Sequence, residues 1–431
     1  MNTKLDGFYN VLSGLNLKQY DKHANNEFKS EAIVPDSILM ELTTGEGIAK
    51  RAVGVLSSTM LKEGFFIKND ADGMIMDKLE ELEVKKRLST VLKWSFGLGG
   101  GVILMGIDDG GELFEPVNES SIKNVKFLKV FDKTEIMPTN RLYGTIDENY
   151  NKTEIWTINT AGLANQINVH ESRLLFFDGE EVTNSQRYAN NGWGYSIFQA
   201  SYNDLQDLLV SWAYCPRLLS DFIKKVTSMD NLLDMVTNGQ EEQVKKRLRL
   251  LDLTSDVMNR EVIDRNLEEF RYETASLTGA VELVDKTELR VSAVWGIPLS
   301  ILFGQTPQGF NSTGKGEEEM FYDKVSGLQG EKLTEPLSRL IRFIQLSTEG
   351  PTKGKEIEGW NIKYNPIKRQ TQNEILESRK LQSEIDISYI SNAVLGVEEV
   401  RASRFGGADY SFETTIDDNL DTFSDLDNID G

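Results

Sequence analysis

The chain has 431 residues, enough for two or three domains or one elongated subunit, and 39% of them are hydrophobic, which can support a core. Its formal net charge of −21 argues against a simple nucleic-acid-binding protein, because such proteins present a basic surface. A single cysteine, Cys215, excludes an internal disulfide and favours a reducing compartment. The only histidines, His23 and His170, make a zinc site or a histidine-based catalytic centre improbable.

The first part of the chain predicts an arm followed by helices. Residues 1–42 are polar and irregular, and we interpret them as an N-terminal arm. From Thr43, apolar side chains recur on one helical stripe until Gly64 stops the pattern, and a short strand at Phe65–Ile67 follows. A second helix is predicted from about Met74 to Phe96, where apolar residues again repeat at helical spacing.

After this helix the apolar periodicity changes to that of strands. A glycine-rich entry at Gly97–Gly101 leads into an apolar run that ends at Ile107, which predicts a buried strand. The glycines follow a helix and precede a strand, the reverse of a dinucleotide-binding fingerprint, so we interpret them as a tight turn. Further strands are predicted at Val125–Phe131, Arg141–Ile146, Glu154–Asn159 and Leu174–Phe177. Residues 43 to about 190 should therefore form an α/β domain with a mostly antiparallel sheet.

The middle of the chain predicts two long helices around a smaller insertion. Ser196 suits a helix N-cap, and the apolar spacing after it predicts a long helix that Pro216 should kink. A basic amphipathic helix at Gln240–Leu251 and a short hairpin within Val257–Phe270 are expected next. Helical spacing then returns at Gly279–Trp295.

The last part predicts a loop, a long helix and a helical end. Acidic residues from Glu317 suit the positive end of a helix dipole, and the apolar stripe of this helix continues past Pro336. A polar loop at 348–361 and a final helical segment at about 371–396 follow. From Phe405 the chain contains eight Asp or Glu residues and no Lys or Arg, so we expect a disordered acidic tail.

One segment offers a choice between a phosphate-binding loop and a flexible connector between helices. Gly309–Lys315 fits the spacing G-x-x-x-x-G-K of nucleotide-binding loops. However, Gly316 stands where such a loop needs Ser or Thr to hold magnesium, and three glutamates follow where phosphates would sit. The connector hypothesis is therefore favoured, and a nucleotide hydrolase using this segment is kept as the alternative. We predict no catalytic residue, metal ligand or cofactor.

Several segments, taken in order, resemble the portal proteins of tailed bacteriophages. The most specific is Trp295–Gly314, WGIPLSILFGQTPQGFNSTG, with Tyr322, Asp323, Gln329 and Leu333–Leu337 after it. The supporting segments are Lys93–Gly106, Val169–Gly179 and Gly192–Gln199. Their order and spacing match the family from residue 43 to about residue 345.

The resemblance implies an α+β portal-type subunit with an α/β wing, long stem helices, a small α/β clip and a helical crown. Such subunits form a ring oligomer, typically a dodecamer. By order along the chain, the implied parts are the N-terminal arm (1–42), wing (43–194), first stem helix (195–225), clip (226–276), second stem helix (277–296), tunnel loop (297–316), wing- or crown-side helix (317–347), C-terminal crown region (348–404) and acidic tail (405–431).

The resemblance also implies a role as a channel at one capsid vertex, for packaging and ejection of double-stranded DNA. The implied partners are further copies of the chain, terminase large subunit, head-completion or adaptor proteins, and the major capsid and scaffold proteins. The implied location is the virion, with assembly in the host cytoplasm. A strongly acidic chain suits transport without capture, because DNA affinity rises with the number of phosphates neutralised. A head–tail adaptor without a channel is a second alternative, and no enzymatic activity is implied.

The implied site residues lie in two segments. Those of the tunnel loop, implied to face passing DNA, are Gln305, Asn311, Ser312, Thr313 and Lys315. Those of the basic clip cluster, which could dock terminase or contact nucleic acid, are Lys245, Lys246, Arg247 and Arg249. Arg290 is a further candidate for brief DNA contacts. A basic cluster like the one at 245–249 is more often a solvated helix face. No apolar run approaches the roughly 18 residues of a membrane span and no signal peptide is visible, so we expect a soluble intracellular chain.

Overall fold

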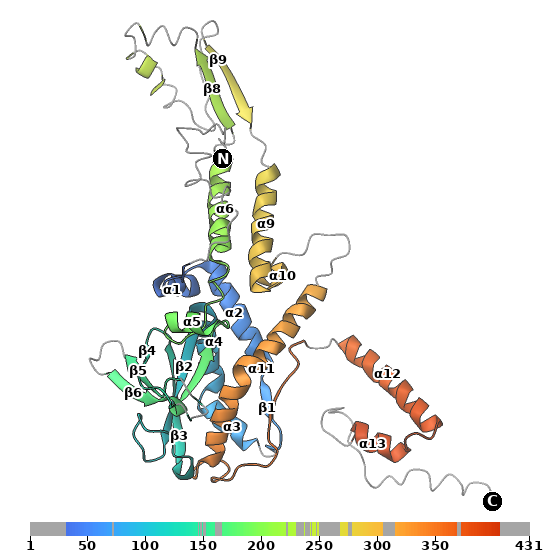
Figure 1. The fold of residues 1–431 in the computed structure, drawn as a ribbon. Coiled ribbons are helices and arrows are strands. Elements are labelled where there is room, and N and C mark those ends of the chain that lie inside the picture. The colour runs from blue at the N-terminus through green and yellow to red at the C-terminus, as the bar shows by residue number, and fades with distance from the viewer. Residues whose placement is uncertain are drawn as a thin grey trace, which may run out of the picture. The chain divides into compact units, whose positions relative to one another are not determined.

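The computed structural model of the chain describes residues 32–70, 73–144, 146, 149, 152–159, 166–220, 223–229, 237, 242, 244–246, 248–249, 268–274, 278–304, 315–368 and 372–405. Residues up to Ile367 and residues from Lys368 form two separate units, and each is described by itself. In the first unit, helices pack on antiparallel sheets, and a pair of helices leads from these sheets to a pair of strands (Figure 1).

The first unit opens with helices that differ in their limits from the predicted ones. Helices α1 (Asp36–Thr44) and α2 (Gly47–Lys62) precede β1 (Phe65–Ile67), and α3 (Met74–Glu81) and α4 (Val84–Leu98) follow it. Helix α1 therefore begins inside the segment that was predicted to be irregular. The prediction of one helix from Met74 to Phe96 is wrong, because Glu83 adopts a left-handed φ of 52° between α3 and α4.

Two three-stranded antiparallel sheets follow α4. The first has the order β3–β2–β7, with β2 at Gly100–Asp108, β3 at Asn124–Asp132 and β7 at Leu174–Asp178. The second has the order β4–β5–β6, with β4 at Ile136–Pro138, β5 at Ile155–Asn159 and β6 at Gln166–His170. The antiparallel arrangement is confirmed, and so are the strands at β2, β3, β5 and β7.

The strand predicted at Arg141–Ile146 is wrong. Among the described residues of this segment, Leu142 forms an isolated bridge to Thr153, and none belongs to a named strand. In the second sheet, β5 pairs instead with β4 and β6, two strands that were not predicted. Strand β4 has only three residues and contains Pro138, so its alternation is too short to be recognised from sequence.

Strand β2 is buried on both faces, which explains its continuous apolar sequence. Ile103 and Met105 belong to the main core, which includes side chains of α4. Val102 and Leu104 belong to a second cluster, together with side chains of β4, β5 and β6. The sheet is therefore covered by helices on one side and by the second sheet on the other.

The glycine-rich entry to β2 is the predicted helix-to-strand turn. Gly99 ends α4 with a left-handed φ of 93°, a conformation that side chains other than glycine rarely adopt. A Cβ atom on Gly100 would overlap the indole ring of Trp193, which packs against the backbone there. The close approach of Trp193, and not phosphate binding, explains why Gly100 is a glycine.

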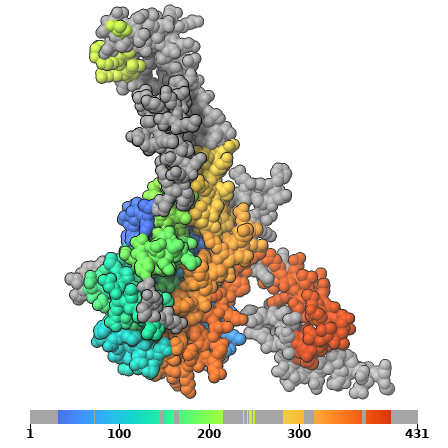
Figure 2. Space-filling model, in the orientation of Figure 1, coloured from blue at the N-terminus to red at the C-terminus, as the bar shows by residue number. Residues whose placement is uncertain are grey.

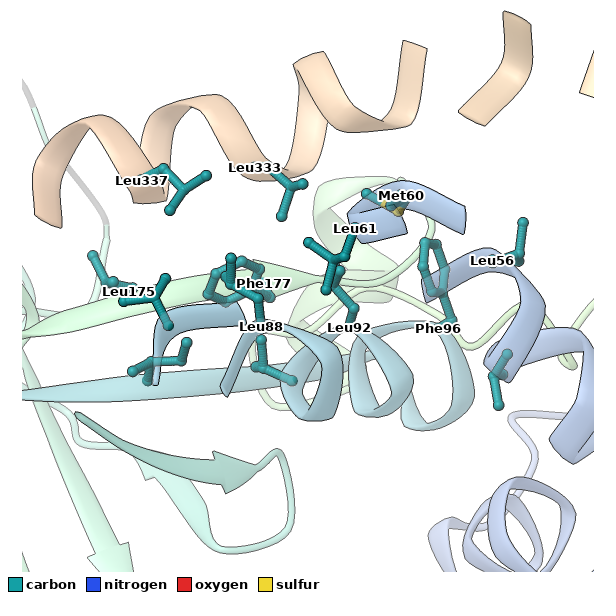
Figure 3. Close-up of a cluster of buried hydrophobic side chains, with 14 of the residues drawn as sticks. Leu56, Met60, Leu61, Leu88, Leu92, Phe96, Leu175, Phe177, Leu333 and Leu337 are labelled. Carbon is teal, nitrogen blue, oxygen red and sulfur yellow. The ribbon is translucent and has the colours of Figure 1, made fainter. Parts of the chain in front are cut away.

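The main core lies between α2, α4, β7 and the long helix α11 (Lys315–Leu346), as Figure 3 shows. The labelled side chains are Leu56, Met60, Leu61, Leu88, Leu92, Phe96, Leu175, Phe177, Leu333 and Leu337. Burying one Leu or Phe side chain contributes about 1.5–3 kcal/mol. Helix α11 continues through Pro336, as predicted, and supplies the last layer of a core that begins near the N-terminus.

A pair of helices extends from this body, and we call it the stem pair. It consists of α6 (Tyr202–Ser220) and α9 (Thr278–Trp295), which pack against each other (Figure 1). The prediction that Ser196 caps the first of these helices is wrong. Helix α6 begins at Tyr202, and the Ser196 hydroxyl lies near the end of α4, where it donates to the Gly97 carbonyl oxygen at 2.7 Å.

A pair of strands lies at the end of the stem pair. Strand β8 (Ile223–Met229) pairs antiparallel with β9 (Glu268–Thr274), with Ile223 opposite Thr274. Most of the hairpin predicted within Val257–Phe270 lies outside the described residues; its last three residues belong to β9, whose partner β8 comes from the other end of the insertion. Strand β8 also begins inside the segment 195–225 that was predicted to be one helix.

The remaining elements close the first unit and form the second. Helix α5 (Asn184–Ala189) and two short 3₁₀ helices, Glu119–Ser121 and Glu171–Arg173, lie beside the sheets, and α10 (Leu299–Leu302) follows α9. Strand β10 (Ile362–Tyr364) pairs with β1. The second unit contains α12 (Gln372–Ser391) and α13 (Val397–Phe405), which confirms a helical segment there. The acidic tail after Phe405 lies outside the described residues.

Candidate functional site

The predicted tunnel-loop residues fall almost entirely outside the described part of the chain. Gln305, Asn311, Ser312 and Thr313 lie there, and Lys315 is described as the first residue of α11. The site can therefore be built from the two helices that flank this loop, α10 before it and α11 after it.

The predicted basic cluster lies on the surface. Lys245, Lys246 and Arg249 occupy helical positions and are exposed, whereas Arg247 lies outside the described residues. The Nζ atom of Lys245 lies 3.9 Å from the Glu242 carboxylate, one helical turn away. An exposed pair of this kind contributes little to stability, and the side chains of Lys245, Lys246 and Arg249 face the surface.

The end of α9 is held by a lysine of α11. The chain turns at Gly296, which has a left-handed φ of 59°, and Pro298 then precedes α10. The Lys324 Nζ atom donates a hydrogen bond of 2.7 Å to the Trp295 carbonyl oxygen, the last residue of α9. A positive charge at this position satisfies a free carbonyl group and interacts favourably with the helix dipole.

The environment of Lys324 changes its acid–base equilibrium. Loss of hydration lowers the pKa of its ammonium group, and the nearby Glu180 carboxylate raises it by a smaller amount. The residue as a whole is exposed, because its hydrocarbon stem reaches across the surface before the Nζ atom meets the backbone. Lys324 thereby ties the helix that enters the loop region to the helix that leaves it.

Three further links fix the flanks of the loop to the body of the first unit. An Arg51 side chain from α2 donates to the Ile301 carbonyl oxygen of α10 at 3.0 Å. The buried Gln329 of α11 donates to the Met60 carbonyl oxygen at 2.6 Å. The buried Lys332 donates to the Gly179 carbonyl oxygen at 2.9 Å. Sequence analysis singled out Gln329 only as part of a motif and missed all three links, because their carbonyl acceptors lie on segments distant in the chain.

The stem pair is held by polar contacts at several levels. The Trp212 indole donates to the Glu288 carboxylate at 3.2 Å, and the Trp295 indole donates to the buried Ser201 hydroxyl at 2.8 Å. Arg290, the predicted candidate for DNA contact, lies 2.9 Å from the Asp204 carboxylate. This ion pair joins α9 to α6, and 70% of the Arg290 side chain remains exposed.

A groove lies where α9, α10 and α11 meet, and we call it the junction groove. It encloses about 700 Å³. Its lining residues are Asp285, Glu288, Leu289, Ser292, Ala293, Gly296, Ile297, Pro298, Leu299, Glu317, Met320, Phe321 and Lys324. Leu289 and Met320 are 56% and 75% exposed, which is unusual for large apolar side chains so close together. Figure 2 shows the surfaces of α9 and α11 adjoining on the face seen there.

The described residues include neither a candidate membrane span nor a candidate metal site. None of their helices is both long enough and apolar enough to cross a membrane. No group of three or more His, Cys, Asp or Glu residues in this part of the chain is arranged to hold a metal ion.

Comparisons with known proteins cover most of this architecture. A family model described as "Phage portal protein" matches residues 39–387. The chain is 23% identical over 363 residues to the anti-CBASS protein Acb1 of Caulobacter sp. (strain RHG1), a match that covers 80% of this chain and 57% of that relative. This chain spans between 56% and 60% of the lengths of the three curated relatives that it matches.

Solved structures share the fold. A chain in the neck of a native gene transfer agent particle, computed with C12 symmetry, superposes with a TM-score of 0.55 at 12% identity, covering 85% of this chain and 92% of that chain. A chain in the virion of the same kind of particle gives a TM-score of 0.56 at 11% identity, covering 88% and 96%. At this level of identity the likeness shows a common fold.

Proposed function

We propose that this chain, which belongs to the phage portal protein family, forms a ring at one capsid vertex through which double-stranded DNA is packaged and ejected. The observation that carries the proposal is the family match, which includes both sheets, the stem pair, the junction groove and α11. The fold shared with a chain from a particle neck with C12 symmetry supports a ring of twelve subunits.

Within such a subunit, we assign the sheets with their helices to the wing, the stem pair to the stem, and the strand pair β8–β9 to the clip. The loop at 305–314, held by the links at α10 and α11, is assigned to the channel wall. Gln305, Asn311, Ser312, Thr313 and Lys315 would then be close to the DNA. Rigid flanks suit this role, because a loop that contacts moving DNA must transmit force to the body without unravelling its own ends.

The basic cluster is assigned to docking of the packaging motor. Lys245, Lys246 and Arg249 are exposed and lie in the insertion between β8 and β9, remote in sequence from the core. Complementary charge would speed the encounter of ring and terminase large subunit. We also assign docking of head-completion proteins and contact with capsid and scaffold proteins to the assembled ring.

A nucleotide hydrolase is disfavoured by the elements before the loop. A phosphate-binding loop follows a strand and opens a helix, whereas residues 278–304 form α9 and α10 and contain no strand. The name of the Caulobacter relative describes a protein of which this chain matches 57%, and we do not carry its activity over.

Electron microscopy of the purified full chain tests the proposal. We expect class averages of closed rings with a central hole, and a mass by light scattering that is a whole multiple of the subunit mass. A chain that stays monomeric at every concentration contradicts the ring. ATP hydrolysis by the purified chain that is lost in Lys315→Ala would instead support the hydrolase.

A further inference from the structure

We propose that the exposed face of α6 of one copy lies in the junction groove of the next copy, so that two different surfaces of the chain form each contact. This inference rests on the ring proposed above and specifies its subunit contact. The partner is a second copy of this chain.

The first surface is one face of α6. Asp207, Val210 and Tyr214 recur at helical spacing and are exposed, with Val210 at 51% and Tyr214 at 53%. The opposite face of the helix is buried, with Leu205 and Leu208 at 1% and 0% exposure. The apolar stripe of Val210 and Tyr214 is therefore directed away from the core of its own chain.

The second surface is the junction groove. Leu289 lies on α9 and Met320 on α11, and both line the groove and remain exposed. The floor of the groove contains the buried Ile297 and Phe321. The groove is thus a largely apolar concave surface that also carries Asp285, Glu288, Glu317 and Lys324, and the stripe on α6 is an apolar surface on the rounded side of a helix.

The stripe and the α9 side of the groove lie at the same level along the stem pair. The hydrogen bonds Trp212–Glu288 and Ser201–Trp295 fix the alignment of α6 against α9. Along the chain, Val210 lies between Ser201, which directly precedes α6, and Trp212, and Leu289 lies between Glu288 and Trp295 of α9. A rotation about an axis roughly parallel to the stem pair therefore carries the stripe of one copy to the height of the groove of the next.

The arrangement favours a closed ring over a symmetric dimer. A dimer with a two-fold axis uses one self-complementary patch, whereas contact between two different patches generates a ring or a filament. The stripe and the groove belong to different sides of one chain: α6 turns its stripe away from its buried face, and the groove is formed by α9 with α10 and α11. Each copy can then contact two neighbours at once.

Disulfide cross-linking tests the contact. Both variants carry Cys215→Ser, which removes the native cysteine. One preparation then carries Val210→Cys and the other Met320→Cys. The two preparations are mixed before assembly and oxidised. We expect a covalent dimer from the mixture and none from either preparation alone, with a ladder of species from the double variant. A mixture of Val210→Cys with Lys93→Cys, an exposed residue of α4, is the control and should give no dimer.

Three results would overturn the contact. In the first, the mixture forms rings but gives no cross-linked dimer. In the second, Val210→Cys alone gives a dimer. In the third, the two cysteines of the double variant form a disulfide within one chain. The absence of rings in the unmodified chain would instead remove the proposed function itself, so the two failures are distinguishable.

Substitution gives a second readout. Met320→Asp should raise the concentration needed for assembly by roughly tenfold, the effect of about 1.4 kcal/mol, while the monomer keeps its circular dichroism spectrum. Met74→Asp, at another exposed methionine that begins α3, is the matched control and should assemble normally. Equal assembly of both variants would contradict the contact.

Discussion

At the scale of single residues, the buried pair Asp109–Arg173 stabilises the turn after β2. The Arg173 Nη2 atom lies 2.9 Å from Asp109 Oδ2, and both side chains are fully buried. Burial raises the pKa of Asp109, but hydrogen bonds from the Asn118 and Gly111 backbone and from Arg173 outweigh it, so the pKa is below its ordinary value. The charged form is therefore favoured by folding.

Replacing Asp109 by asparagine should destabilise the chain by about 3–5 kcal/mol, because Arg173 is left as a buried charge without a counter-ion. Urea unfolding followed by tryptophan fluorescence measures the change. The matched control is Asp108→Asn, whose carboxylate pairs with Lys126 near the surface, and we expect little change there. The stabilisation by Asp109 should be present above its unfolded pKa and be lost as pH falls through the lower folded pKa. Equal effects of both variants would contradict this account.

His170 gives the fold a second pH dependence. Its Nδ1 atom accepts a hydrogen bond of 3.1 Å from the Ser172 N–H and caps the 3₁₀ helix at Glu171–Arg173. Burial lowers the pKa of His170 below 6.5, although the nearby Glu171 and Glu154 carboxylates raise it. Folding therefore favours the neutral ring, and the side chain serves as the cap of this 3₁₀ helix.

His170→Asn should keep the cap and remove the titration. As pH falls below 6.5, the unfolded chain binds a proton that the folded chain does not, so the free energy of unfolding of the unmodified protein should decrease. Between pH 7.5 and pH 5.5, the free energy of unfolding of the variant, measured by urea titration, should decrease less than that of the unmodified protein. Ser172→Ala leaves the imidazole able to titrate and should retain the decrease. A variant with the same slope as the unmodified protein would refute this role.

At the scale of elements, Lys324 joins two helices that flank the predicted channel loop. Lys324→Met keeps a long side chain but removes the hydrogen bond to the Trp295 carbonyl oxygen and the charge at the end of α9. We expect a loss of about 1 kcal/mol and faster amide hydrogen exchange in residues 290–304. Lys353→Met, in the exposed loop after α11, is the control and should exchange as the unmodified chain does. Unchanged exchange in Lys324→Met would show that the cap is dispensable.

At the scale of the whole molecule, an acidic ring that conducts DNA needs few and weak basic contacts. Lys315→Gln should leave ring assembly unchanged and lower the affinity of the ring for double-stranded DNA. It should also make the dependence of affinity on salt less steep, because fewer phosphates are neutralised. Fluorescence anisotropy at several salt concentrations measures both, with Lys93→Gln in α4 as the control. If the unmodified chain, Lys315→Gln and Lys93→Gln show the same salt dependence, Lys315 does not contact the DNA in the channel.

The spacing of apolar residues along the sequence was enough to predict those helices and strands in which it is long and uninterrupted. The buried strand β2, the glycine turn before it, and helices α9 and α11 were predicted from sequence, since their signals lie within one segment. The break at Glu83, the three-residue strand β4 and the pairing of β8 with β9 were not, because they depend on residues distant in the chain. The family likewise followed from motifs in order, and its model match confirms it.

For the candidate site, the sequence alone named the loop from Gln305 to Lys315, and the tertiary structure decided what holds it. A lysine such as Lys324 looks like any surface residue until the end of α9 is folded against α11, because a carbonyl acceptor from another helix cannot be read from spacing. The junction groove and the stripe on α6 are likewise products of packing, since exposure is a property of the folded chain. Periodicity along a chain sets which faces are apolar, and only folding determines which of them remain uncovered.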